Sequence, residues 1–288
     1  MRYVYFPGCS LEAAGAPYQT SISAILGILN LEFEELEDWN CCGSTAYMSF
    51  NETTAFAISA RNLALAQNQG NEVVAPCSAC FLMLNKTNTY LRESSELKRK
   101  IDIALNEAGL KYDGRVNVRH LLDVIVHDVG YEQISAMVKV KLDRLKVAPY
   151  YGCMITRPEC EFDDSEMPTF FDKLISTIGA EFVNFPMKTR CCGGTLSVTK
   201  EDLALEMIKN ILLCAVQNNA DCIVTCCPLC QINLDAYQKK ISERFSQNLS
   251  IPIIYFTQLM GIAFGIPGKK LALNKTIVPT KSILKKVS

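Results

Sequence analysis

The sequence lacks the charge surplus, the long apolar runs and the leader that several classes of protein require. Among 288 residues there are 29 basic and 30 acidic side chains, so no basic surplus favours nucleic acid. Polar residues and prolines interrupt every uncharged stretch long enough to span a membrane, and the apolar stretch behind Arg2 is too short for a secretory signal. We therefore expect a cytoplasmic globular protein without a direct membrane span and without nucleic-acid binding.

A glycine-rich nucleotide loop is also missing. Gly43 and Gly193-Gly194 follow cysteine pairs and do not match G-x-G-x-x-G, so we expect no flavin or nicotinamide on this chain. Cysteine, in contrast, is abundant, with 14 residues. In a chain without an export signal, such thiols are typical of metal binding or catalysis rather than structural disulfides.

The cysteines belong to an internal duplication. The Cys-Cys-Gly motif at Cys41 recurs at Cys191, and the Cys-x-x-Cys motif at Cys77 recurs at Cys227, both 150 positions later. Six extra residues lie in or near the segment from 157 to 168 of the second copy. We predict one domain over residues 1–146, a second over 147–268, and a basic tail over 269–288 that is solvated or contacts a partner.

Each copy alternates predicted strands with predicted helices. Short apolar segments that end next to a cysteine predict strands at Arg2–Phe6, Val73–Ala75, Lys146–Tyr151 and Cys222–Thr225. Apolar residues at helical spacing predict helices at Ile22–Leu29, Thr53–Asn68 and Lys200–Asn218. This order predicts an α/β fold of two pseudo-twofold-related repeats, each a small, mostly parallel, Rossmann-like sheet with flanking helices. Ligands of such sheets bind beyond the carboxyl ends of the strands, where the shared cysteines fall.

Five shared cysteines per copy limit the kinds of metal site that the chain can form. Structural zinc closes with four ligands and an ordinary [4Fe–4S] cubane takes four thiolates, so a fifth cysteine is surplus for either. An adjacent cysteine pair also suits a broad multi-iron core better than one small ion. We therefore predict two metal-binding sets, namely Cys9, Cys41, Cys42, Cys77 and Cys80, and Cys153, Cys191, Cys192, Cys227 and Cys230.

Four cysteines have no counterpart in the first copy. Cys214 and Cys222 are predicted to pack in the core, and no role is predicted for Cys160. Cys226 competes with Cys227, but choosing it would break the Cys-x-x-Cys spacing to Cys230. We therefore assign Cys227 to the second set.

The pattern Cys-x31–38-Cys-Cys-Gly-x33–34-Cys-x-x-Cys, present twice, resembles the CCG domains of HdrB, the cysteine-rich component of heterodisulfide reductase. The segments Arg61–Ala64, Asp221–Cys230 and Ile251–Tyr255 also read like HdrB, up to about Gly268. The resemblance implies two non-cubane [4Fe–4S] clusters, each held by one five-cysteine set, with a disulfide substrate cleaved between them. It further implies two partners from the same enzyme complex, one like the flavin-containing HdrA and one like the ferredoxin-like HdrC.

Other residues bear on the substrate and on protons. Family members that reduce the CoB–CoM heterodisulfide are expected to carry histidines beside the second copy's first cysteine, where this chain has Tyr150 and Met154. The substrate therefore stays open between that heterodisulfide and a protein or sulfur-carrier disulfide. His120 is a candidate proton donor, with a structural histidine as the alternative. Three cations near the cysteines are candidate substrate ligands, with a surface role as the alternative: Arg157, Lys188 and Arg190.

Two other functions stay open. CCG domains also occur in succinate, fumarate, lactate and glycerol-3-phosphate oxidoreductases, where this chain would have a non-catalytic role in electron transfer or anchoring. The third reading is a zinc-stabilised structural module. Five ligands in both copies, without a fused flavin or ferredoxin segment, favour the disulfide reductase. In that reading both cysteine sets face one cleft, whose walls include Ser10, Ser44, Met154 and Thr195.

Overall fold

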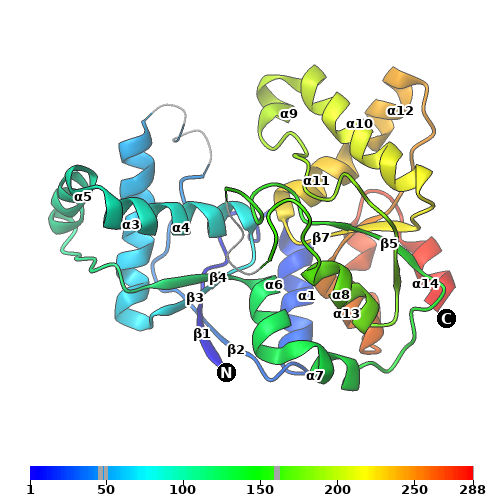
Figure 1. Ribbon diagram of the computed structural model, residues 1–288, viewed down its shortest axis with the longest axis horizontal. Helices are drawn as coiled ribbons and strands as arrows, with labels where there is room; N and C mark the ends of the chain where they lie inside the picture. Colours follow the sequence, from blue (N-terminus) through cyan, green and yellow to red (C-terminus); the bar gives the residue numbers. More distant parts are fainter. Residues whose placement is uncertain (45–47, 49–50, 159–162, 288) are drawn as a thin grey trace.

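Two parallel four-stranded sheets with flanking helices form the protein, as predicted (Figure 1). The computed structural model describes residues 1–44, 48, 51–158 and 163–287. The first half contains β1 (Arg2–Tyr5), α1 (Ala16–Leu26), β2 (Glu32–Glu35), α3 (Glu52–Gln69), β3 (Glu72–Ala75), α4 (Ser78–Glu93), α5 (Ser95–Glu107), β4 (Asn117–His120), α6 (Leu121–Val124), the π-helix η1 (Ile125–Gly130) and α7 (Tyr131–Ala136). The second half contains β5 (Lys146–Tyr150), α8 (Phe170–Thr177), β6 (Glu181–Phe182), α9 (Leu196–Thr199), α10 (Glu201–Gln217), β7 (Cys222–Thr225), α11 (Pro228–Ala236), α12 (Gln238–Phe245), β8 (Ile253–Tyr255), α13 (Phe256–Ala263), the 3-10 helix η2 (Leu273–Lys275) and α14 (Lys281–Val287).

The two sheets repeat one topology. Their strand orders are β2-β1-β3-β4 and β6-β5-β7-β8, and every pair is parallel. Apolar segments form the central strands β1, β3, β5 and β7, which are largely buried, whereas the edge strands β2 and β6 contain glutamates and are largely exposed. The register places His120 beside Ala75 and Tyr255 beside Thr225, so His120 and Tyr255 occupy equivalent positions in the two halves.

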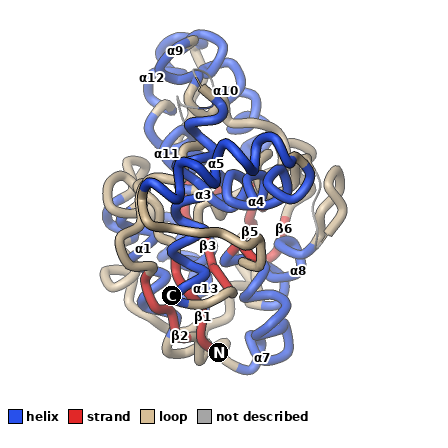
Figure 2. The backbone as a smooth tube through the Cα atoms, turned by 90° about the vertical axis from the view of Figure 1, so that its left-hand side faces the viewer, coloured by secondary structure: helices blue, strands red, loops and turns tan. Residues whose placement is uncertain are grey.

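Three apolar cores hold the molecule together. One lies in the first half under α3, α4 and α5, which Figure 2 shows together on one side of the strands. A second lies in the second half under α10, α11 and α12. The third contains residues of both halves, because α1 packs against α13 and α7 packs against α8 (Figure 1). Within it the rings of Tyr18 and Tyr255 stack at 4.2 Å, so the halves share a core rather than merely touching.

The prediction that the tail after Gly268 is solvated is wrong. Leu271, Leu273 and Ile283 are buried, and the side-chain amide of Gln258 donates to the Leu271 carbonyl at 2.8 Å. The lysine count of the tail hid these aliphatic positions. The tail therefore packs as part of the second half.

Helix lengths and compositions bear on the membrane question. Among the residues that the structure describes, no helix combines the length and the apolar character needed to cross a bilayer.

Candidate metal centre

The strand ends place the cysteines. Cys9 lies four residues beyond the end of β1 and Cys77 two residues beyond the end of β3, and these strands are neighbours at the point where the sheet order reverses. Cys153 and Cys227 follow β5 and β7 in the same way. Crevices at such switch points are where open α/β sheets bind ligands. Cys77 and Cys227 also occupy the N-cap positions of α4 and α11; the neighbouring Cys227 raises the pKa of Cys77, whereas Cys230 and Cys77 lower the pKa of Cys227.

The ten predicted ligands form one row of neighbouring sulfurs, which we call the sulfur row. Within it, the Sγ atoms of Cys9 and Cys41 lie 3.8 Å apart and those of Cys192 and Cys230 lie 3.5 Å apart. The thiols of Cys77 and Cys227 come from different halves and lie close enough that Cys227 raises the pKa of Cys77 while Cys77 helps to lower the pKa of Cys227. Interacting thiols follow one another from Cys9 through Cys41, Cys42, Cys80, Cys77, Cys227 and Cys230 to Cys192, and Cys191, the chain neighbour of Cys192, interacts with Cys153.

The order of the row reflects the duplication. Read from its centre outward, each half presents equivalent cysteines in the same order, as an approximate two-fold axis through the Cys77–Cys227 contact requires. The central members are buried, Cys41, Cys153 and Cys191 are half-buried, and Cys9 is exposed. The two predicted sets therefore meet at a buried centre and reach solvent at the outer ends.

Hydrogen bonds between neighbouring thiols set their acidity. Bonds from Cys42 and Cys9 lower the pKa of Cys41, and a bond from Cys153 lowers the pKa of Cys191 to about 6. Bonds from Cys230 and Cys77 lower the pKa of Cys227 well below the usual range. Ionising all ten thiols in so dense a row requires a compensating positive charge, because neighbouring thiolates repel each other. Soft thiolate donors in this number fit iron–sulfur clusters, whose binding releases the thiol protons.

Two glycines let the chain pass close to these sulfurs. Gly8 and Gly152 have φ values of +72° and +73°. A Cβ atom on Gly8 would lie 2.8 Å from the Sγ atom of Cys80, and one on Gly152 would lie 3.0 Å from that of Cys230. A side chain at either position would displace a candidate ligand.

The cysteines do not form a compact cage for one ion. In the described parts of the chain, no group of three or more Cys, His, Asp or Glu side chains has an arrangement that would hold a single metal ion. The sulfurs instead extend along the row, an arrangement that a polynuclear core can span.

His120 lies next to the centre of the sulfur row. It is fully buried, its Nδ1 atom accepts the Leu122 N–H at 3.1 Å, and its Nε2 atom lies 3.3 Å from the Ser78 hydroxyl. Burial lowers the pKa of His120 to about 4, so the ring is neutral near pH 7. Because Nδ1 accepts a hydrogen bond, the ring proton is on Nε2 and points toward Ser78. Its role as a proton donor stays a prediction.

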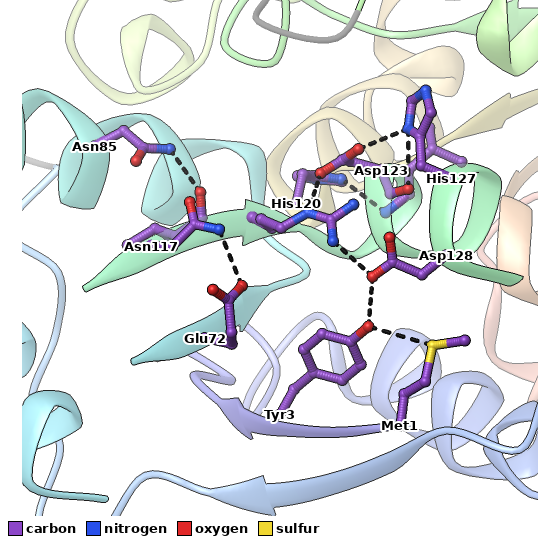
Figure 3. Close-up of polar contacts among 12 residues, drawn as sticks. Met1, Tyr3, Glu72, Asn85, Asn117, His120, Asp123, His127 and Asp128 are labelled. Carbon is purple, nitrogen blue, oxygen red and sulfur yellow. Dashed lines mark hydrogen bonds and ion pairs between the residues drawn. The ribbon is translucent and has the colours of Figure 1, made fainter. Parts of the chain in front are cut away.

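An ionic network supports the strand end that carries His120 (Figure 3). Arg119 contacts Asp123 at 2.6 Å and Asp128 at 2.5 Å, and Tyr3 of β1 donates to Asp128. His127 contacts the other oxygen of Asp123 at 2.7 Å. Partly buried paired charges of this kind join β1, β4 and the π-helix, and they hold His120 in place.

Sequence reasoning missed Ser78, which lies beside His120, and Tyr255, which occupies the equivalent position in the second half. Tyr255 is buried at the position equivalent to His120 and starts α13, as His120 starts α6. The duplication contained the signal, because Val116–Gly130 and Ile251–Gly265 share a pattern that pairs these two residues.

Three of the extra cysteines lie in the described part of the chain, and no hydrogen bond joins them to the ten predicted ligands. The Sγ atom of Cys226 is 3.9 Å from the Ser78 hydroxyl and 3.7 Å from the Tyr151 carbonyl, so its polar neighbours are oxygens. Cys222 is buried in β7 and Cys214 is half-buried on α10, as predicted for packing. Cys160 lies outside the described residues.

The three candidate cations differ in their surroundings. Lys188 is largely buried, contacts Asp172 at 2.8 Å and lies 5.5 Å from the ring centre of Tyr151. Arg157 is exposed and forms an ion pair with Glu166. Arg190 is exposed, and its carbonyl accepts the Tyr150 hydroxyl at 2.6 Å. A role for these cations in substrate binding stays a prediction, as does the cleft lined by Ser10, Ser44, Met154 and Thr195.

An acidic cavity opens beside Cys9, another feature not foreseen from the sequence. It has a volume of about 570 Å³ and is lined by Cys9, Trp39 and four carboxylates. Glu35 accepts the indole N–H of Trp39 at 3.0 Å. The signal was the segment from 32 to 38, where five of seven residues are acidic. The lining carboxylates are Glu12, Glu35, Glu37 and Asp38.

Comparison with known proteins places both repeats in one family. A family model described as CCG, cysteine-rich domain, matches residues 3–85 and 147–235. The chain is 35% identical over 279 residues to the 8-methylmenaquinol:fumarate reductase membrane anchor subunit of Wolinella succinogenes, with 96% of this chain and 97% of that one covered. It is 30% identical over 287 residues to HdrB of the ferredoxin/F(420)H(2)-dependent CoB-CoM heterodisulfide reductase of Methanosarcina acetivorans, with 98% and 95% covered. A hypothetical protein from Helicobacter pylori has a similar fold, with a TM-score of 0.77 at 15% identity over 96% of this chain and 52% of that one.

Proposed function

Because this chain belongs to the CCG cysteine-rich domain family that includes HdrB of heterodisulfide reductase, we propose that it is the disulfide-reducing iron–sulfur component of an electron-transfer complex. The observation that carries the proposal is the buried pair Cys77 and Cys227, one from each half, whose thiols lie close enough for Cys227 to raise the pKa of Cys77. It brings two equivalent five-cysteine sets together, whereas two independent relay centres would not need to meet.

The ten cysteines would hold two non-cubane [4Fe–4S] clusters. Bound clusters supply electrons one at a time, and cleaving a disulfide to two thiols takes two electrons and two protons. A pair of equivalent centres matches that requirement, since each half can serve one sulfur of the substrate. The cysteines act as ligands in this account and do not attack the disulfide as in thiol–disulfide exchange.

The chain's own residues prepare the centre for this reaction. Aromatic and aliphatic side chains in the separate cores of the two halves bury the middle of the sulfur row and keep water away from it. His120 holds a proton on Nε2 within hydrogen-bonding distance of Ser78. We propose that this N–H donates a hydrogen bond to the leaving sulfur while the ring stays neutral, that water supplies the two protons, and that Arg157, Lys188 and Arg190 favour an anionic substrate at the second half.

The electrons must come from partners. This chain has no nucleotide loop, and its ten shared cysteines are assigned to the two clusters. We propose a flavin-containing HdrA-like protein and a ferredoxin-like HdrC-like protein as the partners. The substrate would be the CoB–CoM heterodisulfide or a disulfide of a protein or sulfur carrier.

A second candidate is a non-catalytic electron-transfer role in a fumarate-reducing complex. The observation that favours it is the 35% identity to the Wolinella succinogenes anchor protein, which exceeds the 30% identity to HdrB of Methanosarcina acetivorans. The acidic cavity beside the exposed Cys9 is compatible with this role, because a partner centre could approach one end of the row there.

One experiment separates the two candidates. The complex would be purified anaerobically through a tag on this chain, and its reduced form would be mixed with the CoB–CoM heterodisulfide, a protein disulfide or fumarate. Rapid oxidation by a disulfide, abolished by Cys77→Ser, supports the reductase. Oxidation by fumarate alone supports the electron-transfer role and contradicts the reductase.

A further inference from the structure

A buried amide lies against one of the predicted ligands of the second half. Asn233 is on α11, three residues after Cys230, and is 2% exposed. Its amide nitrogen donates to the Gly194 carbonyl at 2.9 Å and to the Cys192 carbonyl at 3.2 Å, and it lies 3.7 Å from the Sγ atom of Cys192. Two N–H groups thus serve three acceptors, so the sulfur shares one of them with a carbonyl. Asn233 therefore contacts both the loop that carries Cys192 and the sulfur itself.

The first half holds the same loop in a different way. Met83, which is buried on α4, occupies the position equivalent to Asn233, and its thioether cannot donate a hydrogen bond. There the side-chain amide of Asn62 on α3 donates to the Asn40 carbonyl at 3.0 Å, and the side-chain amide of Asn40 donates to the Cys41 carbonyl at 2.8 Å. Both bonds end on carbonyl oxygens. Holding the loop therefore does not require an amide next to a ligand sulfur.

The contact matters most when the sulfur is ionised. A thiolate is a charged acceptor and attracts an N–H group more strongly than a neutral carbonyl does, so ionisation of Cys192 favours the bond to its sulfur. Cys192 is buried, and the low dielectric around it strengthens the interaction. Among the residues that the structure describes, Asn233 is the only one whose side-chain amide donates to a predicted ligand sulfur. The contact thus distinguishes Cys192 from the other nine cysteines.

A donor at a ligand sulfur changes how readily a bound iron–sulfur cluster is reduced. Reduction adds negative charge, part of which lies on the ligand sulfurs, and an N–H group directed at one of them stabilises that charge. Hydrogen bonds to the sulfurs are accordingly among the factors that set the reduction potentials of these clusters. The direction follows from the sign of the charge, because a donor favours the reduced state and raises the potential.

We propose that Asn233 is a positioning residue that raises the reduction potential of the cluster on the second cysteine set, an inference that rests on the proposed function. Its N–H group stabilises the Cys192 thiolate more in the reduced state than in the oxidised state. Met83 provides no such donor at the equivalent position of the first half. Asn233 therefore shifts an electron toward the second set, in the half that carries the three candidate substrate cations.

The test is a redox titration of the full-length protein, purified anaerobically, with the reduction of each cluster followed by electron paramagnetic resonance. Asn233→Met places the residue of the first half at this position and removes both N–H groups. We expect one midpoint potential to fall, with the reduction equilibrium weakened about ten-fold, which is about 59 mV for one electron. The other midpoint should not move. Asn233→Gln keeps the amide and should restore most of the lost potential.

Two further variants separate this effect from support of the loop. Asn62→Leu is the matched control, because it removes a buried amide that holds the equivalent loop through carbonyl oxygens, and it should move neither midpoint. Asn233→Leu also removes the donor and should lower the same midpoint as Asn233→Met. Unchanged midpoints in both Asn233 variants, an equal shift in Asn62→Leu, or loss of iron in both Asn233 variants would each overturn the proposal. A wild-type protein without iron and acid-labile sulfide would instead contradict the proposed function, and this inference with it.

Discussion

The two halves of the molecule share a sheet order and a cysteine frame, but they differ in what surrounds that frame. The outer end of the row is exposed at Cys9 beside an acidic cavity, whereas its counterpart Cys153 is half-buried. The neutral ring of His120 faces the centre from the first half, and the phenol of Tyr255 occupies the same position in the second. The duplication thus accounts for the ten cysteines. The residues around these cysteines differ, so the two halves give the metal centre different surroundings.

Replacing a cysteine where the two halves meet has the largest expected effect, which is a loss of bound iron. Cys77→Ser and Cys227→Ser should each remove about half of the bound iron, because each removes one ligand from a different set. Cys226→Ser is the matched control, since its sulfur lies outside the row, and it should keep the full iron content. Iron and acid-labile sulfide of anaerobically purified protein measure this, and iron loss in Cys226→Ser with retention in Cys227→Ser would reverse our assignment.

The tail packs as part of the second half, so substitutions in it should change the free energy of unfolding. Leu271 is fully buried against Gly261, so Leu271→Ala should lower the free energy of unfolding by ~2–5 kcal/mol. Leu284 is 39% exposed, and Leu284→Ala should cost much less. Chemical denaturation under anaerobic conditions measures both, and equal small effects would mean that the tail is only loosely attached.

Two candidate cations of the second half should differ in how much they stabilise the protein, because Lys188 is largely buried and Arg157 is exposed. Lys188→Ala leaves the largely buried Asp172 without its partner, so it should destabilise the protein by ~3 kcal/mol. Arg157→Ala breaks an exposed pair and should change stability by less than ~1 kcal/mol. Chemical denaturation of the two variants measures the difference, and equal effects would contradict the burial of the Lys188 pair.

Activity then tests the substrate assignment. Arg157→Ala should weaken substrate use, measured as a raised KM, while the iron content stays unchanged. Loss of iron in Arg157→Ala would show that the residue supports the fold instead.

The difference between His120 and Tyr255 predicts the smallest effect, which depends on pH. The pKa of His120 is about 4 in the folded chain against 6.5 for the free side chain, so below pH 6.5 the unfolded state takes up a proton that the folded state does not. Stability should therefore fall as the pH drops from 6.5 toward 4, by ~1 kcal/mol at pH 5.5. His120→Gln should lose this part of the pH dependence, and an unchanged slope in that variant would contradict a buried neutral His120. Tyr255→Phe is the control, because a phenol does not titrate in this range.

Spacing and periodicity predicted much of this fold. The strands that end next to a cysteine were recognisable because apolar segments run into the Gly-Cys and Cys-x-x-Cys motifs, and the duplication supplied the second sheet. The packed tail was missed because Leu271, Leu273 and Ile283 are dispersed among lysines and are buried only through tertiary contacts. Sequence spacing also could not reveal that Cys77 meets Cys227, since that contact depends on how α1 and α13 pack across the halves.

The sequence predicted which types of residue form the site, but it did not predict the burial or the partners of each side chain. Lys188 and Arg157 look alike in sequence, yet one pairs with Asp172 inside the molecule and the other lies at the surface. The neutral state of His120 likewise follows from its burial, which cannot be read from the sequence.

Anomalous diffraction at the iron edge, from crystals grown anaerobically, tests the central claim most directly. The account predicts two separate groups of about four iron atoms, one on each five-cysteine set, that approach each other most closely beside Cys77 and Cys227. A single group, a signal at the zinc edge instead of the iron edge, or two groups separated by packed protein would contradict it.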